Sequence, residues 1–339
     1  MHPDTTESLF TFPSLDASLF SDIRKAGYRR IALQVPGGLV PQTSALVQEI
    51  ERGTGAHVIQ IARPCFGACD PPDNGEMAGA EALIAMGHAP IPNMPHTIPT
   101  YLVEMRAPKV DLDPILDLVV KSGLPKRLCG VASVQHLDLL LPLAAALKER
   151  GYSLEIGRGG RRLGYPGQAL GCNYSSATSV EPEVDGFLFL GTGSFHPMGL
   201  ALSVKKPVWS LDPLQSSIDG PLDRERMVNR RLLTIEKAMD ARTWGILVST
   251  FAGQLRKPLA QKLMEKARGK GLDARILTFH RLDPSDLEGQ RLDAYVVTAC
   301  PRIAIDDGHM FKQPILTPPE FLSAIGERSL IPYLFDVFP

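Results

Sequence analysis

The stretch His57-Val-Ile-Gln-Ile-Ala-Arg-Pro-Cys-Phe-Gly-Ala-Cys-Asp70 joins an apolar run, typical of a buried β-strand, to a loop that carries Cys69. Two other cysteines have similar surroundings. A small residue precedes Cys172 in Leu-Gly-Cys172 and Cys300 in Thr-Ala-Cys300, and the apolar run 295–297 comes just before Cys300. We therefore predict that one structural position is used three times, and that Cys69, Cys172 and Cys300 together form a metal site.

Length and composition place the chain among ordinary globular proteins. Its 339 residues, 44% hydrophobic and 22% charged, are enough for two or three domains. The formal net charge of -1 does not favour a surface that coats nucleic acid. Met1 to Phe12 lacks the apolar core of a signal peptide, and no run approaches about 18 apolar residues. We expect a cytoplasmic protein with no membrane or nucleic-acid partner.

Helix and strand signals alternate along the first third of the chain. A helical face formed by Leu15, Leu19 and Ile23 stops at Gly27. The predicted strands that follow are 30–35, 57–62 and 82–86, with a helix over 43–52 between the first two. This βαβ order implies a parallel sheet with helices packed on its faces.

The same order recurs twice. The second copy has predicted strands 127–134, 153–156 and 186–190 and a helix over 136–150. The third begins with a helix whose buried face holds Met227, Leu232, Ile235 and Met239, and continues with strands 244–250, 274–279 and 294–299 and a helix over 258–268. We predict the α/β class, with three related small α/β domains whose parallel sheets are arranged around a central metal site. The expected domains are 1–122 with Cys69, 123–220 with Cys172 and 221–339 with Cys300.

The chemistry of such a site depends on how many thiols it has. Ligands of open parallel sheets bind at the carboxyl ends of the strands, where the three cysteines fall. The five cysteines of the chain are too few and too scattered for a disulfide framework, so reduced thiols are expected. A 4Fe-4S cluster is normally held by four cysteines, and three would leave one iron with an open, catalytic position. Spacing alone leaves the alternative open that these are buried cysteines acting as small hydrophobic residues.

Six short motifs run in order through nearly the whole chain. They are Gly67-Ala-Cys-Asp70, Gly87-His88, Gly167-Gln-Ala-Leu-Gly-Cys172, Gly191-Thr-Gly-Ser-Phe-His-Pro197, Ala299-Cys-Pro-Arg302 and Ile315-Leu-Thr-Pro-Pro-Glu320. No single motif is decisive, but together and in this order they resemble archaeal diphthamide synthase. That family is a group of iron–sulfur transferases that carry out the first step of diphthamide biosynthesis.

The resemblance implies a homodimer in which each subunit holds a 4Fe-4S cluster on three cysteines, which match Cys69, Cys172 and Cys300. It also implies an unusual radical use of S-adenosylmethionine, in which the bond from sulfur to the γ-carbon of the methionine part is cleaved. The products are methylthioadenosine and a 3-amino-3-carboxypropyl radical. In that family the radical adds to the imidazole C2 of one histidine of translation elongation factor 2, and an external donor supplies the electron.

Cys65 and Cys129 do not match ligand positions of the family. The spacing from Cys65 to Cys69 is that of the first two cysteines in the ordinary radical S-adenosylmethionine signature, Cys-x3-Cys-x2-Cys. Pro72 stands where the third cysteine would be, which excludes that signature.

Loops at other strand ends are candidates for the S-adenosylmethionine pocket. We predict that three sets of residues occupy equivalent places in the three copies: Gln34 with Gly37, Gly191 with Thr192 and Gly193, and Ser249 with Thr250. Their backbone N–H groups and hydroxyls could donate hydrogen bonds to the cofactor. Each glycine can equally mark an ordinary tight turn.

Two further side chains are candidates for chemistry. His196 is the candidate catalytic residue, as a donor to a carboxylate or a proton acceptor, because imidazole titrates near neutrality. A structural hydrogen bond is the alternative for it and for His88. Arg302 could neutralise cluster charge or bind a carboxylate of the cofactor, with a surface ion pair as the alternative.

Two other functions remain open from the residues alone. Quinolinate synthase also arranges three related α/β domains around a cluster held by three cysteines, so a dehydratase is the first alternative. The second is a non-enzymatic ligand-binding protein whose cysteines are incidental. The order of the motifs favours the diphthamide synthase resemblance over both.

Overall fold

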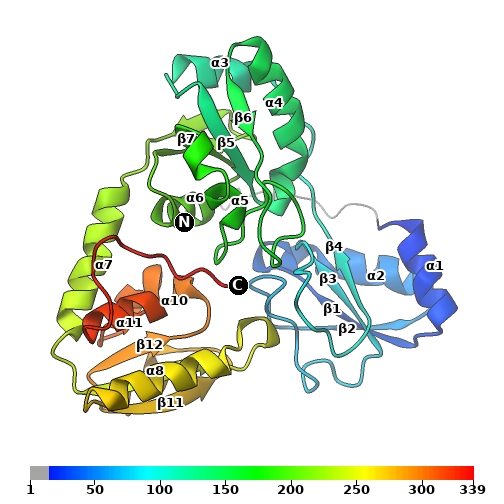
Figure 1. Ribbon diagram of the computed structural model, residues 1–339. Coiled ribbons are helices and arrows are strands. Elements are labelled where there is room, and N and C mark those ends of the chain that lie inside the picture. The colour runs from blue at the N-terminus through cyan, green and yellow to red at the C-terminus, as the bar shows by residue number, and fades with distance from the viewer. Residues whose placement is uncertain (1–14) are drawn as a thin grey trace, which may run out of the picture. The chain divides into compact units, whose positions relative to one another are not determined.

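Three sheets, each built mainly from parallel strands, form the framework of the computed structural model, which describes residues 15–339 (Figure 1). The chain divides into two units, one ending at Lys109 and the other beginning at Val110. The first unit contains one sheet and the second contains two. This architecture confirms the predicted α/β class, while the arrangement around a central metal site stays a prediction. The expectation about a signal peptide in residues 1–12 concerns a segment outside the described residues.

The sheet of the first unit is parallel throughout, in the order β2-β1-β3-β4. Its strands are β1 (Arg30–Gln34), β2 (His57–Gln60), β3 (Ala82–Met86) and β4 (Thr100–Val103). The helices are α1 (Ala17–Ala26), the 3-10 helix η1 (Gly37–Gln42) and α2 (Thr43–Thr54). Asp16 caps α1 by accepting a hydrogen bond from the Ser18 N–H, and Gly27, at φ +71°, ends it in the left-handed region. The predicted elements are confirmed, but β4 was not foreseen because its four residues are all only half-buried.

The second sheet has the order β6-β5-β7-β8-β9, and only β9 runs antiparallel to its neighbour. Its strands are β5 (Arg127–Ala132), β6 (Ser153–Glu155), β7 (Gly186–Leu190), β8 (Val208–Asp212) and β9 (Ser217–Asp219). The helices are α3 (Asp113–Lys121), η2 (Val134–Leu139), α4 (Leu140–Glu149), α5 (Ser175–Thr178), η3 (Glu181–Glu183) and α6 (Phe195–Ser203). The helix predicted over 136–150 therefore begins as a 3-10 turn and becomes α-helical at Leu140.

The third sheet is parallel, in the order β11-β10-β12-β13. Its strands are β10 (Thr243–Ser249), β11 (Asp273–Phe279), β12 (Ala294–Val297) and β13 (Ile315–Leu316). The helices are α7 (Arg224–Ala238), η4 (Ala252–Gln254), α8 (Lys257–Gly269), α9 (Pro284–Glu288), α10 (Pro301–Ile305), η5 (Gly308–Met310) and α11 (Pro318–Ala324).

The predicted buried face of α7 is partly wrong. Met239 lies beyond the last helical residue and is 51% exposed. The residues of the helix that are buried are Val228, Arg231, Ile235 and Ala238. A pattern of apolar residues cannot detect a buried arginine. Arg231 therefore moves the buried face of α7 away from the face that the apolar residues predict.

The three sheets repeat one topology. In each, the first strand (β1, β5 or β10) lies between an edge strand (β2, β6 or β11) and a third strand (β3, β7 or β12). A 3-10 turn and then an α-helix follow the first strand in every copy. The domain limits at 122 and 220 stay a prediction, and α3, which precedes the first of them, packs on α4 and β9.

A buried ion pair joins α7 to α11 in the second unit. The Arg231 guanidinium donates to both carboxylate oxygens of Glu320 at 2.8 Å and to the carbonyls of Ala304 and Ile315 at 2.8 and 2.9 Å. Glu320 also accepts from the Tyr333 hydroxyl at 2.9 Å and from the Thr317 N–H at 2.8 Å. Burial by itself raises the pKa of Glu320, but the charge and hydrogen bonds of Arg231 outweigh it and lower the pKa.

None of the helices within residues 15–339 is long and apolar enough to cross a membrane.

Replacing Glu320 by alanine should lower the free energy of unfolding of the second unit by about 3–5 kcal/mol, because Arg231 would remain buried without an anion. Urea unfolding followed by far-UV circular dichroism measures the loss. Glu288→Ala removes the exposed pair with Lys312, at 3.2 Å, and is the matched control, expected to change stability by less than about 0.5 kcal/mol. Equal effects of the two substitutions would contradict the structure.

The same pair sets a pH dependence. Because the folded-state pKa of Glu320 lies below its unfolded value, the stabilisation is present above the unfolded pKa and is lost as the pH falls through the folded pKa. The difference in stability between the wild type and Glu320→Ala should therefore be full at pH 7 and shrink in acid below about pH 4.

Candidate functional site

The loop that carries Cys69 is fixed by a buried carboxylate. Asp70 is fully buried and accepts hydrogen bonds from Arg63 Nη1 at 2.6 and 2.7 Å and from the Phe66 N–H at 3.2 Å. Its carbonyl accepts from Gln34 Nε2, at the end of β1, at 2.9 Å. Burial raises the pKa of Asp70, and Arg63 offsets only part of that rise. Cys69, half-buried, is thus presented from a loop whose two sides are both anchored.

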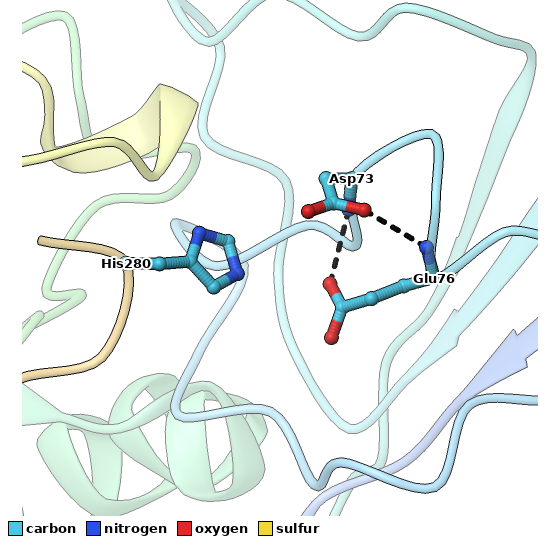
Figure 2. A group of neighbouring side chains, drawn as sticks. All are labelled: Asp73, Glu76 and His280. Carbon is cyan, nitrogen blue, oxygen red and sulfur yellow. Dashed lines mark hydrogen bonds between the residues drawn. The ribbon is translucent and has the colours of Figure 1, made fainter.

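The other side of Arg63 is held by Glu76. Arg63 donates to Glu76 at 2.6 and 3.1 Å. Figure 2 shows why Glu76 is fixed: the Asp73 N–H donates to Glu76 Oε2 at 3.1 Å, and the Glu76 N–H donates to Asp73 Oδ1 at 2.8 Å. His280, which Figure 2 also labels, belongs to the second unit, where its Nδ1 lies 3.0 Å from Thr250 Oγ1.

Cys65 and Cys129 are buried thiols that stay protonated. The Cys65 Sγ lies 3.8 Å from His88 Nδ1. Burial raises the pKa of the Cys65 thiol to about 12, with a further contribution from the negative charge of Asp70. Burial also raises the pKa of Cys129, inside β5, to about 12, and lowers the pKa of His88. A neutral thiol beside a neutral imidazole is a structural contact, which agrees with the structural alternative for His88.

Cys172 lies beside a buried cation. Burial is the largest influence on the pKa of the Cys172 thiol and raises it, whereas the charge and hydrogen bond of the Arg162 guanidinium lower it. Arg162 is 4% exposed, and its Nη2 donates to the Gly253 carbonyl at 2.8 Å. Its Nε has no hydrogen-bond partner among residues 15–339. A carbonyl supplies no negative charge, and an uncompensated buried cation is costly, so a thiolate at Cys172 fits the donors around it.

Cys300 lies in the same unit, three residues after the end of β12 at Val297. Its N–H donates to Gln254 Oε1 at 3.3 Å. Arg256 donates to the two preceding carbonyls, those of Thr298 at 2.6 Å and Ala299 at 3.3 Å. These contacts fix the backbone on the amino side of the thiol.

Tyr174 follows Cys172 by two residues and is one of the largest buried side chains. Its phenol is fully buried, and its hydroxyl has no hydrogen-bond partner within the part of the chain that the structure describes. Burial raises the pKa of Tyr174 most, the positive charge of Arg302 lowers it, and negative charge on Cys172, Asp306 and Cys300 adds to the rise. Two of the three predicted ligands, Cys172 and Cys300, belong to the second unit, and their convergence on one site stays a prediction. The convergence of Cys69 with them stays a prediction.

The three cysteines do not occupy one repeated position. Cys69 follows β2 and Cys172 follows β6, which are equivalent edge strands, but Cys300 follows β12, the equivalent of β3 and β7. The prediction of one position used three times is therefore wrong for Cys300. Each sulfur still comes after the carboxyl end of a parallel strand, which is where this kind of sheet binds ligands.

The predicted pocket loops are also only partly equivalent. Gln34 and Gly37 follow β1, and Ser249 and Thr250 follow the corresponding strand β10. Gly191 to Gly193, including Thr192, follow β7 instead, so the prediction that all three sets occupy equivalent places is wrong. Ser249 holds its own loop, because its Oγ accepts from the Phe251 N–H at 3.1 Å, whereas Gln34 holds the Cys69 loop through the Asp70 carbonyl. A role for these loops in cofactor binding stays a prediction.

His196 and Arg302 are both packed against aromatic rings. His196 lies in the first turn of α6, and its ring is nearly parallel to that of Phe189, with centroids 5.8 Å apart. Arg302 is 3% exposed, which contradicts the alternative of a surface ion pair. It pairs with Asp306 and lies 4.1 Å from the centre of the Phe195 ring. Its Nη1 has no hydrogen-bond partner among the described residues, so it remains able to bind an anion.

Comparison with known proteins identifies the family. Residues 35–333 match the family model described as "Putative diphthamide synthesis protein". The chain belongs to this family. It is 33% identical to 2-(3-amino-3-carboxypropyl)histidine synthase of Pyrococcus horikoshii over 322 residues, 94% of this chain and 92% of that protein. It is 28% identical to subunit 1 of the mouse enzyme of the same name, over 93% of this chain and 73% of the mouse protein.

A solved structure is also similar. The crystal structure of Dph2 from Pyrococcus horikoshii with a 4Fe-4S cluster matches 97% of this chain and 94% of its own, with a TM-score of 0.88 and 33% sequence identity. The family and fold predicted from the six motifs are therefore confirmed. Arg162, Tyr174 and Arg256 were missed, because no short motif shows which of these side chains tertiary contacts bring next to a cysteine loop.

In metal-free protein at pH 8, Cys65 and Cys129 should react with iodoacetamide far more slowly than unfolded cysteine. A pKa of about 12 leaves roughly one thiol in ten thousand ionised, and only the thiolate reacts. Mass spectrometry of the tryptic peptides measures the rates, and urea-unfolded protein, in which all five cysteines should react, is the control. Rapid labelling of Cys65 in the folded chain would contradict its assignment as a protonated structural thiol.

Proposed function

We propose that this chain is a 2-(3-amino-3-carboxypropyl)histidine synthase, a transferase of diphthamide biosynthesis. The observation that carries the proposal is similarity over nearly the whole chain to a synthase of that name, together with the Cys172 thiol placed beside the buried Arg162 cation. Family membership favours this reading over a quinolinate-synthase-like dehydratase and over a non-enzymatic binding protein.

The proposed cofactors are a 4Fe-4S cluster and S-adenosylmethionine. Cys69, Cys172 and Cys300 would hold the cluster, and the Pyrococcus structure with such a cluster supports this assignment. When bound, the cluster supplies one electron for cleavage of S-adenosylmethionine between sulfur and the γ-carbon. In the overall reaction the 3-amino-3-carboxypropyl group replaces the hydrogen at imidazole C2 of a histidine in elongation factor 2, and methylthioadenosine and a proton are released.

The residues of the chain contribute positive charge, hydrogen-bond donors and a site that excludes water. Arg162 places a buried positive charge beside the Cys172 sulfur, which stabilises a thiolate there. Arg302 offers an unused N–H group, and Tyr174 an unused hydroxyl, within the same buried region of the second unit. Burial of these groups excludes water, which strengthens each electrostatic contact. His196 is proposed as the residue that accepts a proton or binds a carboxylate, with Gln34, Gly37, Gly191, Thr192, Gly193, Ser249 and Thr250 as the proposed pocket.

The remaining proposals concern partners and location. We propose elongation factor 2 as the protein substrate, a homodimer as the working assembly, an external electron donor and the cytoplasm as the compartment. No nucleic-acid or membrane partner is proposed.

Cluster-loaded protein, dithionite and S-adenosylmethionine should release methylthioadenosine, and addition of elongation factor 2 should attach one 3-amino-3-carboxypropyl group to it. Anaerobic chromatography and intact-protein mass spectrometry measure the two products. Protein without reductant is the control and should give neither. A loaded, reduced protein that releases no methylthioadenosine would favour the dehydratase, and a colourless protein after anaerobic purification would favour the binding module.

Single alanine substitutions should separate the ligands from the other thiols. Cys69→Ala, Cys172→Ala and Cys300→Ala should each lower bound iron at least about tenfold, because a cluster with two thiolate ligands is weakly held. Cys65→Ala and Cys129→Ala are the matched controls and should retain iron. Bound iron and the visible absorption of the cluster are the measurements. Loss of iron in Cys65→Ala with retention of iron in Cys69→Ala would show that Cys65 is the ligand and Cys69 is not.

A further inference from the structure

Residues 333–338, which we call the C-terminal strap, run from the third sheet to the loop of the second. In Figure 1 the red end of the chain, which follows α11 and includes the strap, passes toward the green loops near α5. The Tyr333 hydroxyl donates to Glu320 of α11 at one end of the strap, and the Phe338 N–H donates to the Cys172 carbonyl at 2.9 Å at the other. The family match ends at residue 333, so most of the strap lies beyond it.

The strap fixes the backbone around Cys172. Besides the bond to the Cys172 carbonyl, the Phe338 carbonyl accepts from Asn173 Nδ2 at 2.7 Å. The Phe335 ring packs edge-on against Tyr174, with centroids 5.8 Å apart. Three consecutive residues of the ligand loop therefore contact the strap.

The strap also holds the cation that fixes the Cys300 loop. Asp336 forms a bidentate ion pair with Arg256, at 2.5 and 3.1 Å. Arg256 in turn donates to the carbonyls of Thr298 and Ala299, the two residues before Cys300. Asp336 is 6% exposed, so water screens this pair little.

One aromatic ring connects the two loops. The guanidinium groups of Arg162 and Arg256 lie over the Phe338 ring, 4.4 and 4.2 Å from its centre. Arg162 lies beside the Cys172 sulfur, and Arg256 holds the Cys300 loop. The negative face of one ring thus keeps two like charges close together that would otherwise repel each other.

We propose that the C-terminal strap is a positioning element that sets the distance between the Cys172 and Cys300 thiols and holds two cations beside them for an anionic metal cluster. Phe338 and Asp336 are its positioning residues. The inference rests on the proposed function, because it concerns the cluster that the two thiols would hold. Residues that orient metal ligands from outside typically change metal affinity 10–100-fold when they are replaced.

The test compares Phe338→Leu and Asp336→Asn with Val337→Ala in the full chain. Phe338→Leu keeps an apolar side chain but removes the aromatic ring. Asp336→Asn keeps the side-chain shape but removes the negative charge. Val337 is 43% exposed in the middle of the strap, and its substitution is the matched control. The readouts are the rate of iron loss to a chelator, the electron paramagnetic resonance spectrum of the reduced cluster, and Tm with and without cluster.

Phe338→Leu and Asp336→Asn should lose iron about tenfold faster than wild type and broaden the resonance spectrum. The rise in Tm on cluster binding should shrink in both, because the stabilisation by a ligand that binds the folded state grows with the logarithm of its affinity. Val337→Ala should match the wild type in every readout.

Two results would overturn the inference alone. The first is wild-type iron retention in both strap variants. The second is an equal fall in Tm with and without cluster, which would make the strap ordinary packing. If wild-type protein takes up no cluster after reconstitution with iron and sulfide, the proposed function fails as well, and that result is distinguishable because it needs no variant.

Discussion

A positive charge buried in a protein needs negative or strongly polar partners, and this requirement organises the second unit. Arg231 is satisfied by Glu320 and two carbonyls, and Arg256 by Asp336 and two carbonyls. Arg162 has a carbonyl and an aromatic ring, neither of which carries a full charge. The uncompensated positive charge of Arg162 lies beside Cys172, and a cysteine that loses its proton on binding a metal would supply the missing negative charge. Structural arginines and the chemistry of the site thus belong to one electrostatic arrangement.

Repetition of a fold unit does not oblige each copy to place its candidate metal ligand alike. The three sheets share strand order and the 3-10 turn after the first strand. Cys69 and Cys172 follow the equivalent edge strands, while Cys300 follows a different strand of its sheet. All carboxyl ends of parallel strands open on the same edge of a sheet, so a ligand can move to a neighbouring strand without leaving that edge. The repeated fold therefore determines at which edge of the sheet a cysteine is placed, but not which strand it follows.

Local patterns predicted the interior of the fold well. Strand β1 was foreseen within one residue, because Ile31 and Leu33 belong to a continuous buried run. The cysteines and their family were also recognisable from short motifs. The half-buried β4 and the helix α6, which begins at Phe195-His-Pro, gave no clear periodicity. Arg162 and Arg231 are buried against partners about 90 residues away in the chain, and such pairings leave no trace in a local sequence window. The pocket loops were misaligned for the same reason, since strand equivalence depends on sheet order.

The bond between Asn173 and Phe338 spans 165 positions of the chain. Contacts this distant form late, because the intervening segment must first be made and ordered. At about 5–20 residues per second, a ribosome needs about 10–30 s to pass from one partner to the other. Throughout that interval a nascent chain has Cys172 available without the segment that covers its backbone. Under the proposed function, metal delivered during synthesis would meet Cys172 on an unfixed loop, whereas metal delivered afterwards would meet it on a loop that the strap holds.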